Sequence, residues 1–149
     1  MSAPPDLKPK FDYNEQAAAS FLANRGGAGG LPEFLGIRIV DVGPGTMHGR
    51  LDVRPELLTG FGNMHGGVLS AFCDHLLGCV CYPVMKKGQW AATTEFKINL
   101  TAPVSKGNVD AYAEITNLTR TQAVVRIDVV NEGRLAATAQ GTVTIRDPR

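Results

Sequence analysis

The stretch GNMHGGVLSAFCDHLLG, residues 62–78, contains the residues whose types and spacing could do chemistry. It begins with His65, Gly66 and Gly67 and runs into an apolar segment whose one formally charged residue is Asp74. If a helix begins at Gly66, its first backbone N–H groups lack acceptors within the helix and lie at the positive end of its dipole. A carbonyl oxygen could be polarised there as in an oxyanion hole, and glycine would let it approach the backbone closely.

Asp74 is unusual because its neighbours on a helix are apolar or small. Ser70 precedes it by one turn and Gly78 follows it by one turn, which leaves space beside the carboxylate. Burying an unpaired acid costs roughly several kcal/mol, so such a group needs a partner or a purpose. Two interpretations stay open from the residues alone. Asp74 is either a structural acid bonded to a loop amide or an arginine, or a base or nucleophile facing an electrophile. The two glycines, in turn, could simply make a tight turn from strand to helix.

The segments before this helix are short. Residues 14–24 place apolar side chains on one face of an amphipathic helix, and RGGAGG, residues 25–30, then forms a flexible joint. RGGAGG lacks the Lys-Ser/Thr ending and the preceding strand of a phosphate-binding loop. Two strands are expected around residues 36–42 and 46–54. We therefore divide the chain into an N-terminal extension, residues 1–30, and one domain, residues 31–149.

The long helix is expected from about Gly66 to Met85, and the pattern changes completely after it. Four runs rich in Val, Ile and Thr predict a meander of four antiparallel strands, over residues 91–101, 108–118, 121–131 and 134–146. The result is an α+β domain in which one curved antiparallel sheet wraps around one long central helix. Because the helix is apolar or small on all sides, one sheet can cover only part of it, and we expect a second subunit to cover the rest.

Composition narrows the function classes. The chain has 149 residues, 44% of them hydrophobic, and a net charge of +1, so it lacks the broad basic surface typical of nucleic-acid binding. No signal-peptide pattern is present, and polar residues interrupt the apolar run, so we expect no membrane span. Three cysteines inside that run favour reduced, buried thiols and a cytoplasmic protein. His75 and Cys79 have helical metal-ligand spacing, but no second pair accompanies them, so we expect no metal.

The segment 62–78 resembles the signature of hotdog-fold acyl-CoA thioesterases of the PaaI-like and THEM-type group. In that group a His-Gly-Gly is followed, after six residues, by the catalytic acid, and HGG-VLSAFC-D has this spacing. TTEFKINLTAPVSKG, residues 93–107, also resembles a strand pattern of the family, and the resemblance extends from about residue 34 to 146. It implies a hotdog fold, a homodimer that commonly pairs into a homotetramer, and active sites between subunits. The implied reaction is hydrolysis of an acyl-CoA thioester to free acid and coenzyme A, without a cofactor.

The resemblance also implies residue roles. The backbone N–H of Gly66, aided by Gly67, would hold the thioester carbonyl oxygen. Asp74 would come from the partner subunit, as general base on water or as nucleophile. Thr93 matches the family's water-positioning Ser or Thr, and Thr94 is the alternative one residue further along.

His65 would fix the turn by hydrogen bonding and assist at the carbonyl. Two departures from the family pattern affect these roles. Thr59 stands where members often carry Asn, six residues before the histidine, and Asn63 either substitutes for it from a different backbone position or the water is held differently. Ala102 stands where a basic residue often precedes the proline, which removes one expected contact to coenzyme A.

Substrate binding is less specified by the sequence. Phe61 is placed to act as a lid near the entrance. Basic residues near strand ends are candidates for the phosphates of coenzyme A, with ordinary solvated charges as the alternative: Lys106, Arg120, Arg134, Lys86 and Lys87. Two rival functions stay open, a hotdog hydratase or dehydratase and an acyl-CoA-binding module without turnover. An α/β-hydrolase is excluded because the chain is short and lacks a Gly-x-Ser-x-Gly elbow.

Overall fold

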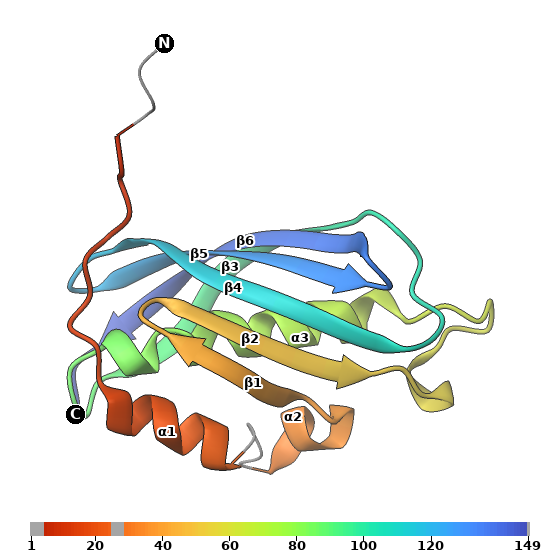
Figure 1. Ribbon diagram of the computed structural model, residues 1–149, viewed down its shortest axis with the longest axis horizontal. Coiled ribbons are helices and arrows are strands. Elements are labelled where there is room, and N and C mark those ends of the chain that lie inside the picture. The colour runs from red at the N-terminus through yellow and green to blue at the C-terminus, as the bar shows by residue number, and fades with distance from the viewer. Residues whose placement is uncertain (1–4, 25–28, 149) are drawn as a thin grey trace.

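Strands form where alternate side chains can share one apolar face, and β5 (Gln122–Asn131) shows this directly. Val125, Ile127 and Val129 are fully buried, whereas Arg126 between them is exposed. The computed structural model (Figure 1) describes residues 5–24 and 29–148. Its other strands are β1 (Arg38–Gly43), β2 (Thr46–Asp52), β3 (Trp90–Leu100), β4 (Asn108–Leu118) and β6 (Arg134–Arg146). The helices are α1 (Glu15–Asn24), α2 (Gly30–Leu35) and α3 (Gly66–Cys79), with short 3₁₀ turns η1 (Pro55–Leu57) and η2 (Tyr82–Val84).

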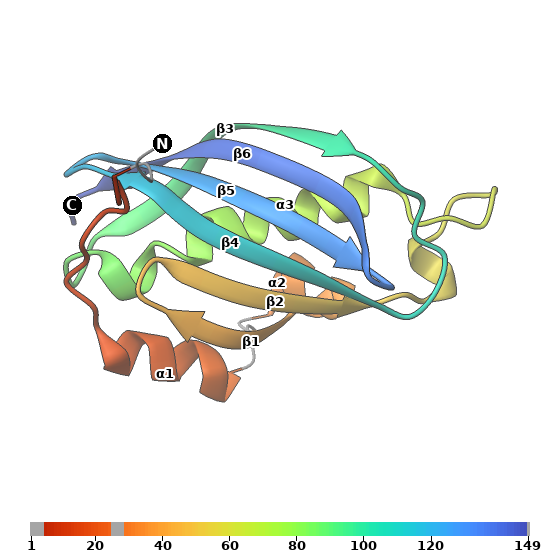
Figure 2. The same ribbon diagram turned by 45° about the horizontal axis from the view of Figure 1, so that its top comes forward.

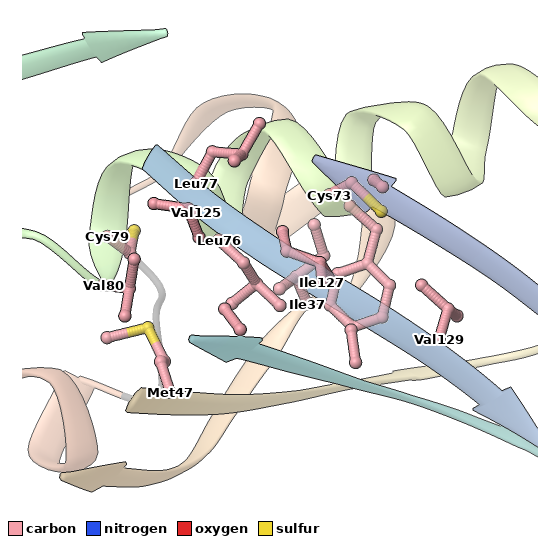
Figure 3. Packing of buried hydrophobic residues seen from close by; sticks show 14 of the residues in the cluster. Ile37, Met47, Cys73, Leu76, Leu77, Cys79, Val80, Val125, Ile127 and Val129 are labelled. Carbon is pink, nitrogen blue, oxygen red and sulfur yellow. The ribbon is translucent and has the colours of Figure 1, made fainter. Parts of the chain in front are cut away.

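The strands form one antiparallel sheet that curves around α3 (Figures 1 and 2). Leu76 of α3 and Val80, the residue that caps its C-terminus, meet buried side chains of β2 and β5 in a single core (Figure 3). Leu76 is fully buried and Val80 is 1% exposed. The predicted α+β architecture of one sheet wrapped around one helix is therefore confirmed.

The predicted four-strand meander is wrong at one connection. The strand order is β1-β2-β4-β5-β6-β3, so β3 pairs with β6, and only β4, β5 and β6 form a meander. The reason lies in α3, which crosses beneath the sheet after β2 and delivers the chain to the opposite edge. β4 then returns to fill the position beside β2.

The long helix also ends earlier than the predicted Met85. α3 stops at Cys79, and the chain continues through the 3₁₀ turn that contains Pro83. Proline lacks a backbone N–H and disfavours helical geometry at the residue before it, so the α-helix cannot continue through this position.

The N-terminal arm and α1 cover the β1 edge of the sheet. Tyr13 donates its hydroxyl to the Val42 carbonyl (3.1 Å), and Asn14 caps α1 by accepting from the Ala17 N–H (3.0 Å). Phe11 lies so close to Gly45, at φ 69°, that a Cβ there would fall 2.3 Å from its ring. The predicted flexible joint falls mostly on residues 25–28, which lie outside the described residues. The β3 edge has no such cover within the described chain.

By length and composition alone, the segment Gly66–Val84 could cross a membrane. In this fold more than half of it is buried by the sheet and the segments around it. The mostly buried core helix of a wrapped sheet meets the same criteria, so the segment is weak evidence for membrane insertion.

Candidate active site

The N-terminus of α3 leaves one backbone donor open. Gly67 donates its N–H to Nδ1 of His65 (2.8 Å), and Val68 donates to the His65 carbonyl (2.9 Å). The Gly66 N–H has no acceptor within the described chain. Because His65 Nδ1 accepts a hydrogen bond, the neutral ring carries its proton on Nε2. The Gly67 N–H, expected to assist at a substrate carbonyl, is thus occupied by the His65 cap, and Gly66 offers the free donor.

Neighbouring segments hold this turn in place. His65 donates its N–H to the Leu57 carbonyl (2.9 Å), and Met64 donates to the Val104 carbonyl (2.6 Å). At Gly66 a Cβ would lie 2.6 Å from Leu100 Cδ1 at the end of β3. A larger residue at this position would therefore have to displace the exposed Leu100 side chain.

Asp74 lies on the side of α3 that the sheet does not cover. Its side chain is exposed in the single chain and makes no hydrogen bond or ion pair with the described residues. It lines an open cavity of about 560 Å³ together with Ser70, Ala71 and residues 93–96 of β3. No described arginine or loop amide holds it, so the structural-acid interpretation lacks a partner here.

A β-bulge decides which β3 threonine faces Asp74. Thr93 pairs with the buried Val143, Glu95 pairs with Thr142, and Thr94 is the extra residue between them. The Thr94 hydroxyl is hydrogen-bonded to that of Thr144 on the outer face of the sheet. Thr93 therefore points to the α3 side, and Thr94 contributes only its proximity to the cavity wall.

The thiols near Asp74 are not poised as nucleophiles. Burial, with a smaller contribution from Asp74, raises the pKa of Cys73 to about 12. Burial likewise raises the pKa of Cys79 to about 12. His75 contacts Cys79 Sγ through Nε2 (3.5 Å), and burial lowers the His75 pKa, an effect that Asp74 opposes. No group of three or more potential metal ligands gathers within residues 5–24 and 29–148.

Other expected site residues are dispersed. Phe61 is 97% exposed at the tip of the loop that precedes the His-Gly-Gly turn. Lys106, paired with Glu132 (3.5 Å), and Arg120, paired with Asp147 (3.7 Å), lie at opposite ends of β4. The structure therefore does not bring these two cations together.

One basic residue at a cavity was not predicted from the sequence. Lys10 of the N-terminal arm lines a cavity of about 360 Å³ with Lys86 and Arg120, over a floor that includes Phe11 and Val84. The sequence carries no signal for this neighbourhood, because only the folded path of the arm brings Lys10 to the β4–β5 turn.

One antiparallel sheet wrapped around one long helix is the hotdog fold, and the relatives described below make the chain a hotdog-fold thioester hydrolase of PaaI-like type. The chain belongs to the thioesterase superfamily, whose sequence profile matches residues 61–138, just over half of its length.

Solved structures agree with this assignment. The phenylacetic acid degradation protein PaaI of Thermus thermophilus, as an Asn-to-Asp mutant, is 31% identical, with 76% of this chain and 96% of that chain covered and a TM-score of 0.69. A conserved protein of Pseudomonas aeruginosa is 29% identical over 83% of this chain and 99% of that one, with a TM-score of 0.78. A thioesterase of Haemophilus influenzae is 23% identical over 95% of each chain, with a TM-score of 0.78, and supports the fold alone. Among curated proteins no sequence matches significantly.

Proposed function

We propose that the protein hydrolyses an acyl-CoA thioester to the free acid and coenzyme A. The Gly66 N–H polarises the thioester carbonyl, and Asp74 acts as general base on water or as nucleophile. The observation that carries this proposal is Asp74 itself, an unpaired carboxylate at an open cavity on a helix whose N-terminal donor is also unpaired. An electrophile held at that donor and attacked with the help of a carboxylate is the arrangement that acyl transfer requires.

The two groups lie far apart on one helix. Asp74 follows Gly66 by eight residues, which is about 12 Å along a helix at about 1.5 Å per residue. As a nucleophile Asp74 must approach the carbonyl carbon to within about 3 Å, and as a general base it must reach the attacking water. We therefore combine Gly66 of one protomer with Asp74 of its partner, as the family resemblance implies, and the protein acts as a homodimer.

The bare edge of β3 is the place for that partner. β3 has eleven residues, its outer edge is unpaired within the described chain, and it carries the exposed Trp90 and Leu100. An exposed strand edge of this length is a ready template for pairing with another chain. A second copy paired there would also cover the Asp74 side of α3. Two such dimers would associate into a tetramer, as the family resemblance implies.

Thr93 and the basic cavity complete the assignment. Thr93 lies across the cavity from α3, where its hydroxyl positions the attacking water for Asp74. The cavity with Lys10, Lys86 and Arg120 offers cations for the phosphates of coenzyme A. Lys106, at the other end of β4, is a solvated surface charge in this proposal.

Release of free thiol from a panel of acyl-CoAs, by wild type and Asp74→Asn, tests the proposal. We expect turnover of at least one acyl-CoA by wild type and a loss of about 100-fold in kcat/KM in the variant, because the amide can neither accept the proton nor attack. Equal thiol release by both proteins would remove Asp74 from the mechanism. Tight acyl-CoA binding without release would indicate a binding module, and water addition to an enoyl-CoA would indicate a hydratase.

A further inference from the structure

The loop before the His-Gly-Gly turn has a shape set by its backbone. Thr59 donates its N–H to the Asn63 carbonyl (2.7 Å), and Gly62, at φ 84°, donates to the Thr59 carbonyl (2.9 Å). Leu58 and Met64 add a β-bridge at the base of the loop. These contacts close the turn without help from side chains.

The side chains of Thr59 and Asn63 nevertheless form a bond of their own. Thr59 Oγ1 accepts from the Phe61 N–H (3.2 Å) and lies 3.3 Å from Asn63 Oδ1. An amide oxygen can only accept, so the Thr59 hydroxyl must donate to it. This bond engages Oδ1. No hydrogen bond within the described chain uses Asn63 Nδ2.

Asn63 borders a second hollow close to the open Gly66 N–H. This hollow, of about 250 Å³, has largely apolar walls that include Leu69, Leu100 and Pro103. Leu100 is also the side chain that packs against Gly66. Thr101, on the same wall, donates its hydroxyl to the Leu135 carbonyl (2.6 Å), so that hydroxyl is already engaged. The Asn63 amide is thus an open donor at an apolar hollow beside the helix N-terminus.

We propose that Asn63 Nδ2 donates to an amide carbonyl on the thiol side of the substrate, and that Thr59 is a positioning residue that orients it. The inference rests on the proposed thioester hydrolysis and deepens it by assigning a recognition element. In a coenzyme A thioester the first amide stands two methylene groups from the sulfur. With the thioester carbonyl at Gly66, the neighbouring hollow receives the methylene groups, and Asn63 meets the amide beyond them. A single neutral hydrogen bond of this kind changes affinity by about threefold to tenfold.

The test compares two thioesters of one acyl group, an S-acyl-N-acetylcysteamine, which keeps the amide, and an S-butyl thioester, which lacks it. The measured quantity is the ratio of their kcat/KM values. We expect Asn63→Ala and Thr59→Val to lower this ratio about threefold to tenfold relative to wild type. Thr59→Ser keeps the hydroxyl and should keep the ratio. The matched control is Thr116→Val on β4, which removes an exposed hydroxyl bonded to the Val124 carbonyl of β5.

A merely structural role would lower both kcat/KM values together and leave their ratio unchanged. An unchanged ratio in Asn63→Ala and Thr59→Val, with both thioesters still hydrolysed, therefore overturns this inference and spares the proposed function. A lower ratio in Asn63→Ala but not in Thr59→Val overturns the positioning role assigned to Thr59. Absence of thiol release by wild type from both thioesters and from every acyl-CoA of the panel overturns the proposed function and this inference with it.

Discussion

Asp74 and Asp110 are carboxylates with opposite surroundings. Asp110, on the outer face of β4, accepts from His48 Nε2 (2.6 Å) and Arg50 Nε (2.8 Å), and its side chain is 18% exposed. Its burial alone would raise its pKa, but hydrogen bonds from Arg50 and His48 outweigh burial and lower the pKa below its usual value. Asp74, on the opposite face of the fold, is exposed and makes no bond to the described chain.

The difference separates an acid bonded within the fold from one left open to a ligand. The partners of Asp110 are themselves fixed, since the His48 ring stacks on Tyr112 with centroids 4.4 Å apart. Both bonds go to Oδ1 of Asp110, and such a network of a carboxylate with two basic partners stabilises the fold. Asp74 offers free lone pairs at a cavity and contributes nothing visible to the packing of its own chain. Replacing the carboxylate with an amide should therefore lower activity at Asp74 and stability at Asp110.

The largest expected effect is on activity, in the pair Asp74→Asn and Asp110→Asn. Asp74→Asn should lower kcat/KM for acyl-CoA hydrolysis by about 100-fold, because it removes the group that accepts a proton or attacks. Asp110→Asn should stay within about threefold of wild type, since its carboxylate faces away from the cavity. Thiol-release assays on both purified variants measure this. Equal losses in the two variants would contradict the distinction drawn between the acids.

Stability should show the reverse order. Asp110→Asn should lower the free energy of unfolding by about 2 kcal/mol, since it weakens hydrogen bonds between charged partners on a partly buried site. Asp74→Asn should stay within about 0.5 kcal/mol, as is usual for an exposed position without partners. Urea unfolding at pH 7 measures both values.

The difference in unfolding free energy between wild type and Asp110→Asn should depend on pH. Because the folded state lowers the pKa of Asp110, its contribution is fully present above the unfolded pKa, near about 3.9, and is lost as the pH falls through the folded value. The stability gap between wild type and Asp110→Asn should therefore close below about pH 4. A gap that persists undiminished at lower pH would show that the carboxylate charge is not its source.

Much of this fold could be predicted because its signals are local. Alternation placed the four long strands within one or two residues of their observed bounds, as for β4 at Asn108–Leu118. Alternation reveals which face of a strand is buried but not which strand lies beside it. The pairing of β3 with β6 therefore could not be predicted, since it depends on the path of α3 beneath the sheet.

The same distinction between local signals and contacts of distant segments applies to the candidate site. The turn at Gly66 and the acid Asp74 were identified because both lie on one helix at fixed spacing. The choice between Thr93 and Thr94 could not be made, since a one-residue bulge reverses the face that a strand residue presents. Lys10 could not be found because its neighbours come from distant segments.

Thr93 and Thr94 extend the comparison to neighbours on opposite faces of β3. Thr93→Val should lower kcat/KM by about tenfold, because it removes the hydroxyl that positions water beside Asp74. Thr94→Val should stay within about twofold, because its hydroxyl is bonded to Thr144 on the outer face. The two variants are matched in chemistry, and assays with one acyl-CoA compare them. A larger loss in Thr94→Val would show that the bulge lies elsewhere in the proposed dimer.

The smallest expected effect concerns His65, whose side chain could contribute to both stability and activity. Its Nδ1 caps α3 by accepting from the Gly67 N–H, so His65→Ala should lower the free energy of unfolding by about 1 kcal/mol. His65→Ser supplies another cap acceptor and should recover most of that loss, as urea unfolding would show. If the imidazole acts only as a cap, His65→Ser also recovers kcat/KM. Recovered stability with kcat/KM still reduced would instead assign the Nε2 proton a part at the carbonyl. Full stability in His65→Ala would contradict the cap and release the Gly67 N–H as a second donor beside Gly66.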